Sequence, residues 1–173
     1  MERRVSSALA AAAVLAAVPA QAADYAMPGV ADVQGWKVIR TANSCGMNRL
    51  YPAAESSAAP HTSLMILAEH GRYSTHVVLT NAAWPTEADK RYLLRYDLGD
   101  FSYRMPATGL RAEGVAGFET DVSDNFLYDI SRAEDLTISR DGTVLGKMSL
   151  RGGYAAVVEF RECVAAMRAE QRR

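Results

Sequence analysis

A change of hydrophobic period near the C-terminus constrains the fold of this chain more than any other feature. Between residues 135 and 168 the sequence passes from a short, roughly alternating pattern, through Arg151-Gly152-Gly153, into a 3.6-residue pattern. Asp141-Gly142 divides the first part, and this dipeptide favours a type I′ turn, in which both central residues need positive φ. The stretch therefore predicts a β-hairpin that leads directly into a helix.

The apolar residues of this hairpin do not keep one parity. Val144, Met148 and Leu150 are even, whereas Leu145 is odd. Gly146 lies where the parity changes, so we expect a β-bulge there.

The segment after Gly153 carries one apolar stripe at helical spacing. Its members recur at i, i+3, i+4 and i+7 and comprise Ala156, Val157, Phe160, Cys163, Val164 and Met167. The pattern predicts a helix near residues 153–170, with Cys163 on its buried face.

The N-terminus has the pattern of a secretory signal. Arg3 and Arg4 precede a short run of small and apolar residues over 5–18, and Ala20-Gln21-Ala22 forms an A-x-A cleavage site. This run is shorter than the roughly 20 residues that a spanning helix needs. We expect a signal peptide at 1–22 and export to the periplasm or beyond after cleavage near Ala22. Twin-arginine export and a retained N-terminus are the alternatives.

The remaining chain, residues 23–173, has the size of a single domain of about 150 residues. Removing Glu2, Arg3 and Arg4 from the 19 basic and 20 acidic residues leaves 17 and 19, a net charge of −2. This balance provides no electrostatic basis for binding nucleic acid or an anionic membrane. No later stretch is apolar and long enough to predict a membrane span.

The chain has two cysteines, Cys45 and Cys163. In an oxidising compartment such a pair predicts a disulfide, here between the second strand and the last helix. The chain-entropy model assigns the closure of so long a loop about 4–5 kcal/mol. The alternative is two buried free thiols.

The middle of the chain predicts a series of short strands. We expect strands at 35–41 and 45–51, a small-residue loop at 52–60, and a strand pair at 91–98 and 101–105. A hairpin at 62–69 and 73–80 turns at Gly71-Arg72, in a register that places Leu64 opposite Leu79 and Ile66 opposite Val77.

Three glycines between residues 109 and 122 argue against a helix and predict a loop followed by a strand near 115–120. Asp124 is the expected cap of a short helix at 125–132, with Phe126, Leu127 and Ile130 facing inward. The element order predicts a mainly β (α+β) fold, an antiparallel sandwich or partial barrel covered by the terminal helix.

The candidate chemistry is weak. His70 and His76 fall on opposite faces of the predicted hairpin and His61 lies in the loop, so surface or rim histidines are favoured over a metal site. Ser123 and Ser149 lack a G-x-S-x-G context. Paired carboxylates could catalyse glycoside hydrolysis, and the candidates are Glu113, Glu119, Asp121 and Asp124. We favour the simpler interpretation that these are solvated acids in loops and at strand edges. Gly152-Gly153 suits a tight turn better than an anion cradle. We therefore predict no catalytic residues, no cofactor and no metal.

One hairpin gathers the best candidates for a binding surface, Tyr92, Tyr96, Tyr103 and Arg104. Exposed aromatic and arginine side chains are typical of recognition surfaces, whereas buried ones form core. Alternation in the strands favours a core face and a mixed polar rim.

Three short segments resemble one known family. They are GWKV at 35–38, SCGM at 44–47 and MSLRGGYAA at 148–156. Together with the export signal they are similar to the invasion-associated locus B family of small exported proteins from Gram-negative bacteria. The resemblance covers most of the mature chain loosely. It implies a β-sandwich-like fold in the periplasm or envelope, no cofactor, and a role in host interaction or envelope function.

The sequence thus favours an exported, non-catalytic binding or accessory domain stapled by one disulfide. Its expected partner is a protein or an envelope component. The alternative is a periplasmic hydrolase with an unrecognised Ser/His/acid site.

Overall fold

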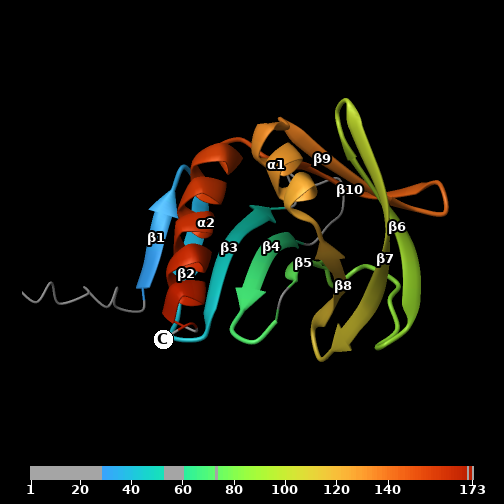
Figure 1. Cartoon of the computed structure of the whole chain (residues 1–173). Coiled ribbons are helices and arrows are strands. Elements are labelled where there is room, and N and C mark those ends of the chain that lie inside the picture. The colour runs from blue at the N-terminus through green and yellow to red at the C-terminus, as the bar shows by residue number, and fades with distance from the viewer. Residues whose placement is uncertain (1–28, 53–60, 73, 171, 173) are drawn as a thin grey trace, which may run out of the picture.

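The computed structural model describes residues 29–52, 61–72, 74–170 and 172. Within these residues, ten strands and two helices follow one another, and Figure 1 shows their arrangement. In chain order they are β1 (Gly29–Val33), β2 (Trp36–Arg40), β3 (Ser44–Pro52), β4 (His61–Glu69), β5 (Thr75–Thr80), β6 (Arg91–Leu98), β7 (Phe101–Ala112), β8 (Val115–Val122), α1 (Asp124–Arg132), β9 (Asp135–Arg140), β10 (Thr143–Ser149) and α2 (Gly153–Glu170). The predicted signal peptide and most of the predicted 52–60 loop lie outside the described residues.

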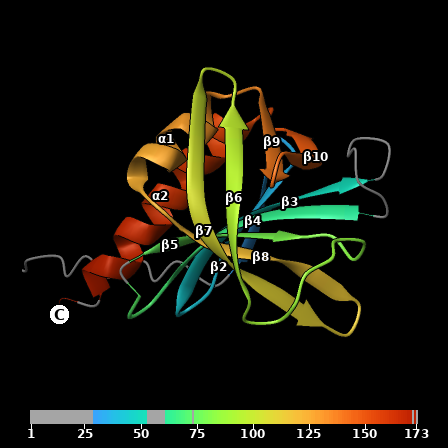
Figure 2. The same cartoon turned by 90° about the vertical axis from the view of Figure 1, so that its right-hand side faces the viewer.

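All ten strands form one antiparallel sheet in the order β1-β2-β3-β4-β5-β8-β7-β6-β9-β10. The order of strands in the sheet departs from their order in the chain after β5, because β8 pairs with β5 and β9 pairs with β6. The sheet is strongly bent, so that β6 and β7 cross β3, β4 and β5 at a steep angle (Figure 2). The mainly β prediction is confirmed as an open, antiparallel sheet.

Helix α2 covers the inner face of the sheet at β2 and β3, and α1 packs beside it. The predicted stripe of α2 is buried throughout, including Cys163 at 2% exposure. The core also holds Trp36, Tyr51 and Phe118, all fully buried. Burial of this apolar face, more than helix propensity, holds α2 in place.

The two hairpin predictions are confirmed. Leu64 pairs with Leu79 and Ile66 with Val77, as expected from alternation. In the last hairpin Asp141 and Gly142 both have positive φ, 51° and 80°. The β9–β10 register shifts between Val144 and Gly146, which is the predicted bulge.

Four expectations need correction. Strand β1 was not predicted, because its residues are almost all exposed and carry no apolar alternation. Residues 109–112 continue β7 rather than forming a loop. His61 begins β4 rather than lying in a loop, and His76 is buried at 2% exposure rather than at a rim.

The cap of the short helix also differs. Ser123, not Asp124, is the N-cap of α1, and its side chain accepts a hydrogen bond from the backbone N–H of Phe126. Asp124 is instead the first residue of the helix, where its charge suits the positive end of the dipole. The inward face is as predicted, with Phe126, Leu127 and Ile130 buried.

Candidate functional site

The turn from β10 to α2 joins one edge of the sheet to the strands near its other edge. β10 ends at Ser149 and α2 begins at Gly153. Gly152 has a φ of +80°, and a Cβ placed there would lie 2.7 Å from both Cβ and the carbonyl oxygen of Gln34. Any other residue would be strained in backbone conformation and would also clash with the β1–β2 turn. The glycine therefore serves a tight turn, in agreement with the sequence-based preference.

Three side chains from β2 and β3 fix the carbonyl groups of this turn. The Arg151 carbonyl accepts from Trp36 Nε1 at 3.1 Å and from Arg49 Nη1 at 2.6 Å. The Ser149 carbonyl accepts from the Tyr51 hydroxyl at 2.8 Å. The Arg49 guanidinium also lies over the Trp36 and Tyr51 rings, 6.0 and 5.3 Å from their centroids. We call Trp36, Arg49 and Tyr51 the turn clamp.

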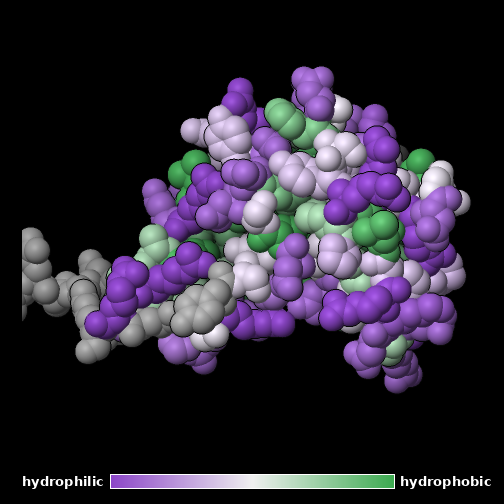
Figure 3. All heavy atoms as spheres, turned by 45° about the vertical axis from the view of Figure 1, so that its right-hand side comes forward, coloured by the Kyte–Doolittle hydropathy of each residue, from purple (hydrophilic) through white to green (hydrophobic). Residues whose placement is uncertain are grey.

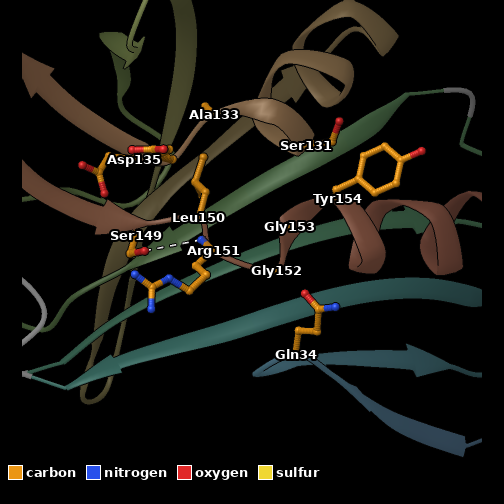
Figure 4. Close-up of a pocket in the computed structure, with 11 residues that line it drawn as sticks. Gln34, Ser131, Ala133, Asp135, Ser149, Leu150, Arg151, Gly152, Gly153 and Tyr154 are labelled. Atoms are coloured by element: carbon orange, nitrogen blue, oxygen red, sulfur yellow. Dashed lines mark hydrogen bonds between the residues drawn. The ribbon is translucent and has the colours of Figure 1, made fainter.

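A pocket of about 370 Å³ opens beside the clamped turn (Figure 4). We call it the turn pocket. It is lined by Gln34 of the β1–β2 turn, by Ser131 and residues 133–135, and by residues 149–154. Tyr154 stands at its rim with 67% exposure. The Arg151 backbone N–H donates to the Ser149 hydroxyl at 3.4 Å across its floor. Polar and charged side chains dominate this lining.

A second pocket, of about 540 Å³, lies on the other side of residues 133–135. We call it the acidic pocket. The tip of the β6–β7 hairpin, Leu98–Phe101 in chain order, forms one wall, and the C-terminal end of α1 forms the other. Residues 133–135, which comprise the link from α1 to β9 and the first residue of β9, are shared with the turn pocket. We call this segment the 133–135 connection.

The acidic pocket carries four carboxylates and one guanidinium. These groups belong to Asp100, Asp129, Glu134, Asp135 and Arg132. Asp135 pairs with Lys147 of β10 at 2.9 Å. Arg132 instead lies over the ring of Tyr128 and donates to its hydroxyl. The pocket therefore retains an excess of negative charge.

Asp129 is the buried member of this set, at 8% exposure. Its Oδ2 accepts a hydrogen bond from the Tyr103 hydroxyl. This hydrogen bond to a carboxylate, with burial, raises the pKa of Tyr103 to about 12. The Asp129 carboxylate thus has a hydrogen-bond donor, but this donor is neutral, so the negative charge of Asp129 is not balanced.

A third pocket, of about 440 Å³, surrounds Tyr92 at the opposite end of β6. Lys90 and Arg140 place their cationic groups 5.8 and 5.3 Å from the Tyr92 ring centroid. Both cations have other partners, since Lys90 pairs with Glu87 and Arg140 donates to the Pro85 carbonyl. The Tyr92 hydroxyl accepts from the Glu87 backbone N–H at 2.9 Å. These contacts fix the 85–90 loop on the sheet.

The four residues predicted as a binding surface are divided between two faces of the sheet. Tyr96 pairs with Tyr103, and both rings pack edge-on against Phe126. Tyr96 is fully buried, and its hydroxyl forms a hydrogen bond of 2.6 Å with the Thr120 hydroxyl. Burial raises the pKa of Tyr96. Arg104 pairs with Arg95 on the outer face, where both are exposed. A binding role for the exposed part of this hairpin stays a prediction.

His76 has neighbours that the sequence did not bring together. Its Nε2 lies 3.4 Å from the Ser74 hydroxyl, and its Nδ1 lies 2.7 Å from Asp121 Oδ1 and 3.4 Å from Glu119 Oε1. Nδ1 nevertheless has no hydrogen bond, because the carboxylates lie off the direction of its N–H. His70 is exposed, so the two histidines do not meet. Across the described ranges, no three His, Cys, Asp or Glu side chains gather as a metal site.

The predicted disulfide is present. Cys45 of β3 and Cys163 of α2 are bonded across 118 residues of sequence, and both are buried. Within the part of the chain that the structure describes, no helix has the length and apolar character of a membrane span. On the face shown in Figure 3, apolar atoms reach the surface only in separate patches between polar side chains.

Sequence reasoning missed the acidic pocket and the turn clamp. Asp100, Asp129 and Glu134 belong to no motif in the sequence, and the bend of the sheet brings the hairpin tip to the end of α1. Arg49 stands next to no acidic residue in sequence, and its partner is a carbonyl 102 residues away. The motif MSLRGGYAA did mark the turn that the clamp holds.

Comparisons with known proteins give one informative result. No protein-family model matches the chain, and no curated protein matches it in sequence. Among solved structures, invasion-associated protein B from Bartonella henselae matches with a TM-score of 0.56 at 11% sequence identity. The match covers 84% of this chain and 99% of that one. The chain is thus similar in fold to invasion-associated protein B, which confirms, at the level of structure, the distant resemblance found in its sequence.

Proposed function

We propose that this chain is an exported domain of the bacterial envelope that binds a protein or envelope component and catalyses no reaction. The observation that carries the proposal is the buried Cys45–Cys163 disulfide, because such bonds persist in oxidising compartments. The signal-like N-terminus supports the same compartment. The shared fold with an invasion-associated protein supports an envelope role.

The binding region of this proposal is the pair of pockets that flank the 133–135 connection. Tyr154 stands at the edge of the turn pocket with 67% exposure, and Phe101 at the edge of the acidic pocket with 53%. Partly exposed aromatic side chains beside a pocket are the kind of anchor that protein interfaces use. The turn clamp and the disulfide hold the surrounding backbone, which limits the entropy lost on binding.

Photocrosslinking in intact cells tests the proposal. A benzophenone side chain replaces Tyr154 or Phe101 in the exported chain, and Val115, 45% exposed at the far end of β7 and β8, is the matched control. We expect one discrete crosslinked product from both test positions and none from the control. Equal products from all three positions, or none from any, would reject the proposed binding region.

A second function, a periplasmic hydrolase, has one observation in its favour. His76 lies between Ser74 and Asp121, 3.4 Å from the serine hydroxyl and 2.7 Å from the carboxylate, in the order that a serine nucleophile needs. Two features weigh against it: the His76 ring is 2% exposed, and its Nδ1 is not bonded to the carboxylate. Esterase activity on p-nitrophenyl acetate that disappears in Ser74→Ala but persists in Ser102→Ala would revive this function.

A further inference from the structure

The acidic pocket has the shape and charge to receive part of a ligand. Its volume of about 540 Å³ is within the range of pockets that hold small ligands or protruding side chains. Ala133 contributes apolar surface to its lining, which also includes the largely buried Leu98. Phe101 adds an aromatic side chain that is 53% exposed at the edge of the pocket.

The charges of this pocket are not balanced from within the protein. Asp100 and Glu134 form no ion pair among the described residues, and Asp129 is bonded only to a neutral phenol. Arg132, the single cation in the lining, is turned to Tyr128 instead of to these acids. The C-terminal end of α1 adds the negative end of a helix dipole to the same wall. The pocket therefore favours a cationic group.

The cation that fits is organic. The carboxylates are spread over a wide pocket, and within the described segments no three acidic or histidine side chains converge on one point as metal ligands do. Apolar surface lies next to the acids, so the ligand needs an apolar part beside its charge. A lysine or arginine next to an aromatic or aliphatic residue in a peptide segment meets both conditions.

We propose that the acidic pocket binds a lysine or arginine side chain of a protein partner, with the neighbouring apolar residue of that partner packed on Phe101. This inference rests on the proposed function, because it names the partner chemistry of the same region. Asp100 and Glu134 supply the exposed charges, and the buried Asp129 adds a negative potential behind them. The partner is an exposed, basic and apolar peptide segment.

Fluorescence polarisation with defined peptides tests this chemistry on the whole exported chain. The probe is a fluorescein-labelled peptide in which lysine and phenylalanine alternate. One comparison peptide replaces lysine with glutamate, and another replaces phenylalanine with serine. We expect binding of the first peptide, none of the glutamate peptide, and about tenfold weaker binding of the serine peptide, since an aromatic contact of about 1.4 kcal/mol is lost. Equal binding of the lysine–serine peptide would reject the apolar contact and with it the proposed partner.

Substitutions that remove the charges of the acidic pocket test whether the peptide binds there. Asp100→Asn with Glu134→Gln should weaken binding of the lysine–phenylalanine peptide by about fivefold or more at low salt, and less at high salt. The control combines Asp89→Asn and Glu113→Gln, which make the same charge change at the other end of β6 and β7. Phe101→Ser should weaken binding without changing its salt dependence. Equal losses in the test and control pairs would show non-specific attraction and overturn the proposal.

The same variants separate this inference from the proposed function. If the benzophenone at Phe101 captures a partner in cells and the Asp100→Asn, Glu134→Gln pair reduces the yield, both stand. If the yield is unchanged by that pair, the partner binds without the acidic pocket and this inference fails alone. If no position captures a partner, the proposed function fails as well.

Discussion

Cys45 and Cys163 join β3 to the helix that covers it, α2, with their Cα atoms 5.9 Å apart across 118 residues of sequence. Both sulfurs are buried under α2. The bond therefore closes nearly the whole folded domain into one loop, and it does so at the face where α2 packs on β2 and β3.

Removing this disulfide should cost much of the stability of the domain. For the double variant Cys45→Ala, Cys163→Ala we expect a loss of about 4–5 kcal/mol in the free energy of unfolding, as an upper figure from chain entropy. Urea unfolding with and without reductant measures it. The double variant should be insensitive to reductant, whereas the natural chain should be sensitive. A loss below about 1 kcal/mol would contradict a stabilising role.

Gly152→Ala should be more costly than a comparable change elsewhere. Both Gly152 and Gly114 have positive φ, but a Cβ at Gly114 meets nothing within 4 Å, whereas one at Gly152 meets Gln34 at 2.7 Å. We expect about 1 kcal/mol of destabilisation for Gly114→Ala, from backbone strain alone, and at least about 2 kcal/mol for Gly152→Ala. Thermal unfolding of both variants gives the comparison. Equal costs would mean that the contact with Gln34 relaxes freely.

Removing the guanidinium from the turn clamp should destabilise the domain. Arg49→Met keeps part of the stacking on Trp36 and Tyr51 but removes a donor from the Arg151 carbonyl. We expect a loss of about 1–2 kcal/mol in the free energy of unfolding. Arg161→Met, an exposed change on α2, is the control and should stay within about 0.5 kcal/mol. A loss that is no larger for Arg49→Met would show that Trp36 and Tyr51 hold the turn without the arginine.

The Tyr103–Asp129 bond predicts a pH dependence. Tyr103→Phe leaves a buried carboxylate without its donor and should lower the free energy of unfolding by about 1–3 kcal/mol at pH 8. The pKa of Tyr103 is raised from 10.0 to about 12 in the folded chain. The bond therefore contributes fully below pH 10, and its contribution disappears as the pH rises through 12.

Urea unfolding at several pH values between 8 and 12 tests this dependence. The difference between the natural chain and Tyr103→Phe should be constant up to about pH 10 and shrink above it. Tyr128→Phe, whose hydroxyl only accepts a bond from the exposed Arg132, should show no such trend. A difference that does not change with pH would mean that the phenol is not held by the carboxylate.

Patterns in the sequence predicted much of this fold because the fold depends on them. The parity of residues 64–68 against 75–79 determined the hairpin register, since a slip by one residue would turn the apolar set to solvent. The parity change around Gly146 located the bulge. The 3.6-residue stripe placed Cys163 under α2, beside Cys45.

The misses also have physical causes. Gly109 favoured a loop in the sequence, but it lies inside β7, where a glycine is needed because a Cβ would come within 2.2 Å of the Glu87 carbonyl oxygen. His76 lies on the outer face of β5, where polar residues were expected to be exposed, and the acids of β8 enclose it. The acidic pocket joins residues about 30 positions apart through the bend of the sheet, which no local pattern encodes.

Export and the disulfide are tested together by the intact mass of the protein recovered from cells, with thiol alkylation before and after reduction. We expect a chain that begins at Ala23, takes up no alkylating reagent until it is reduced, and then takes up two equivalents, one at each cysteine. A full-length chain alkylated at Cys45 and Cys163 without reduction would contradict it. Export, the disulfide in the cell and the proposed envelope function would then all have to be abandoned.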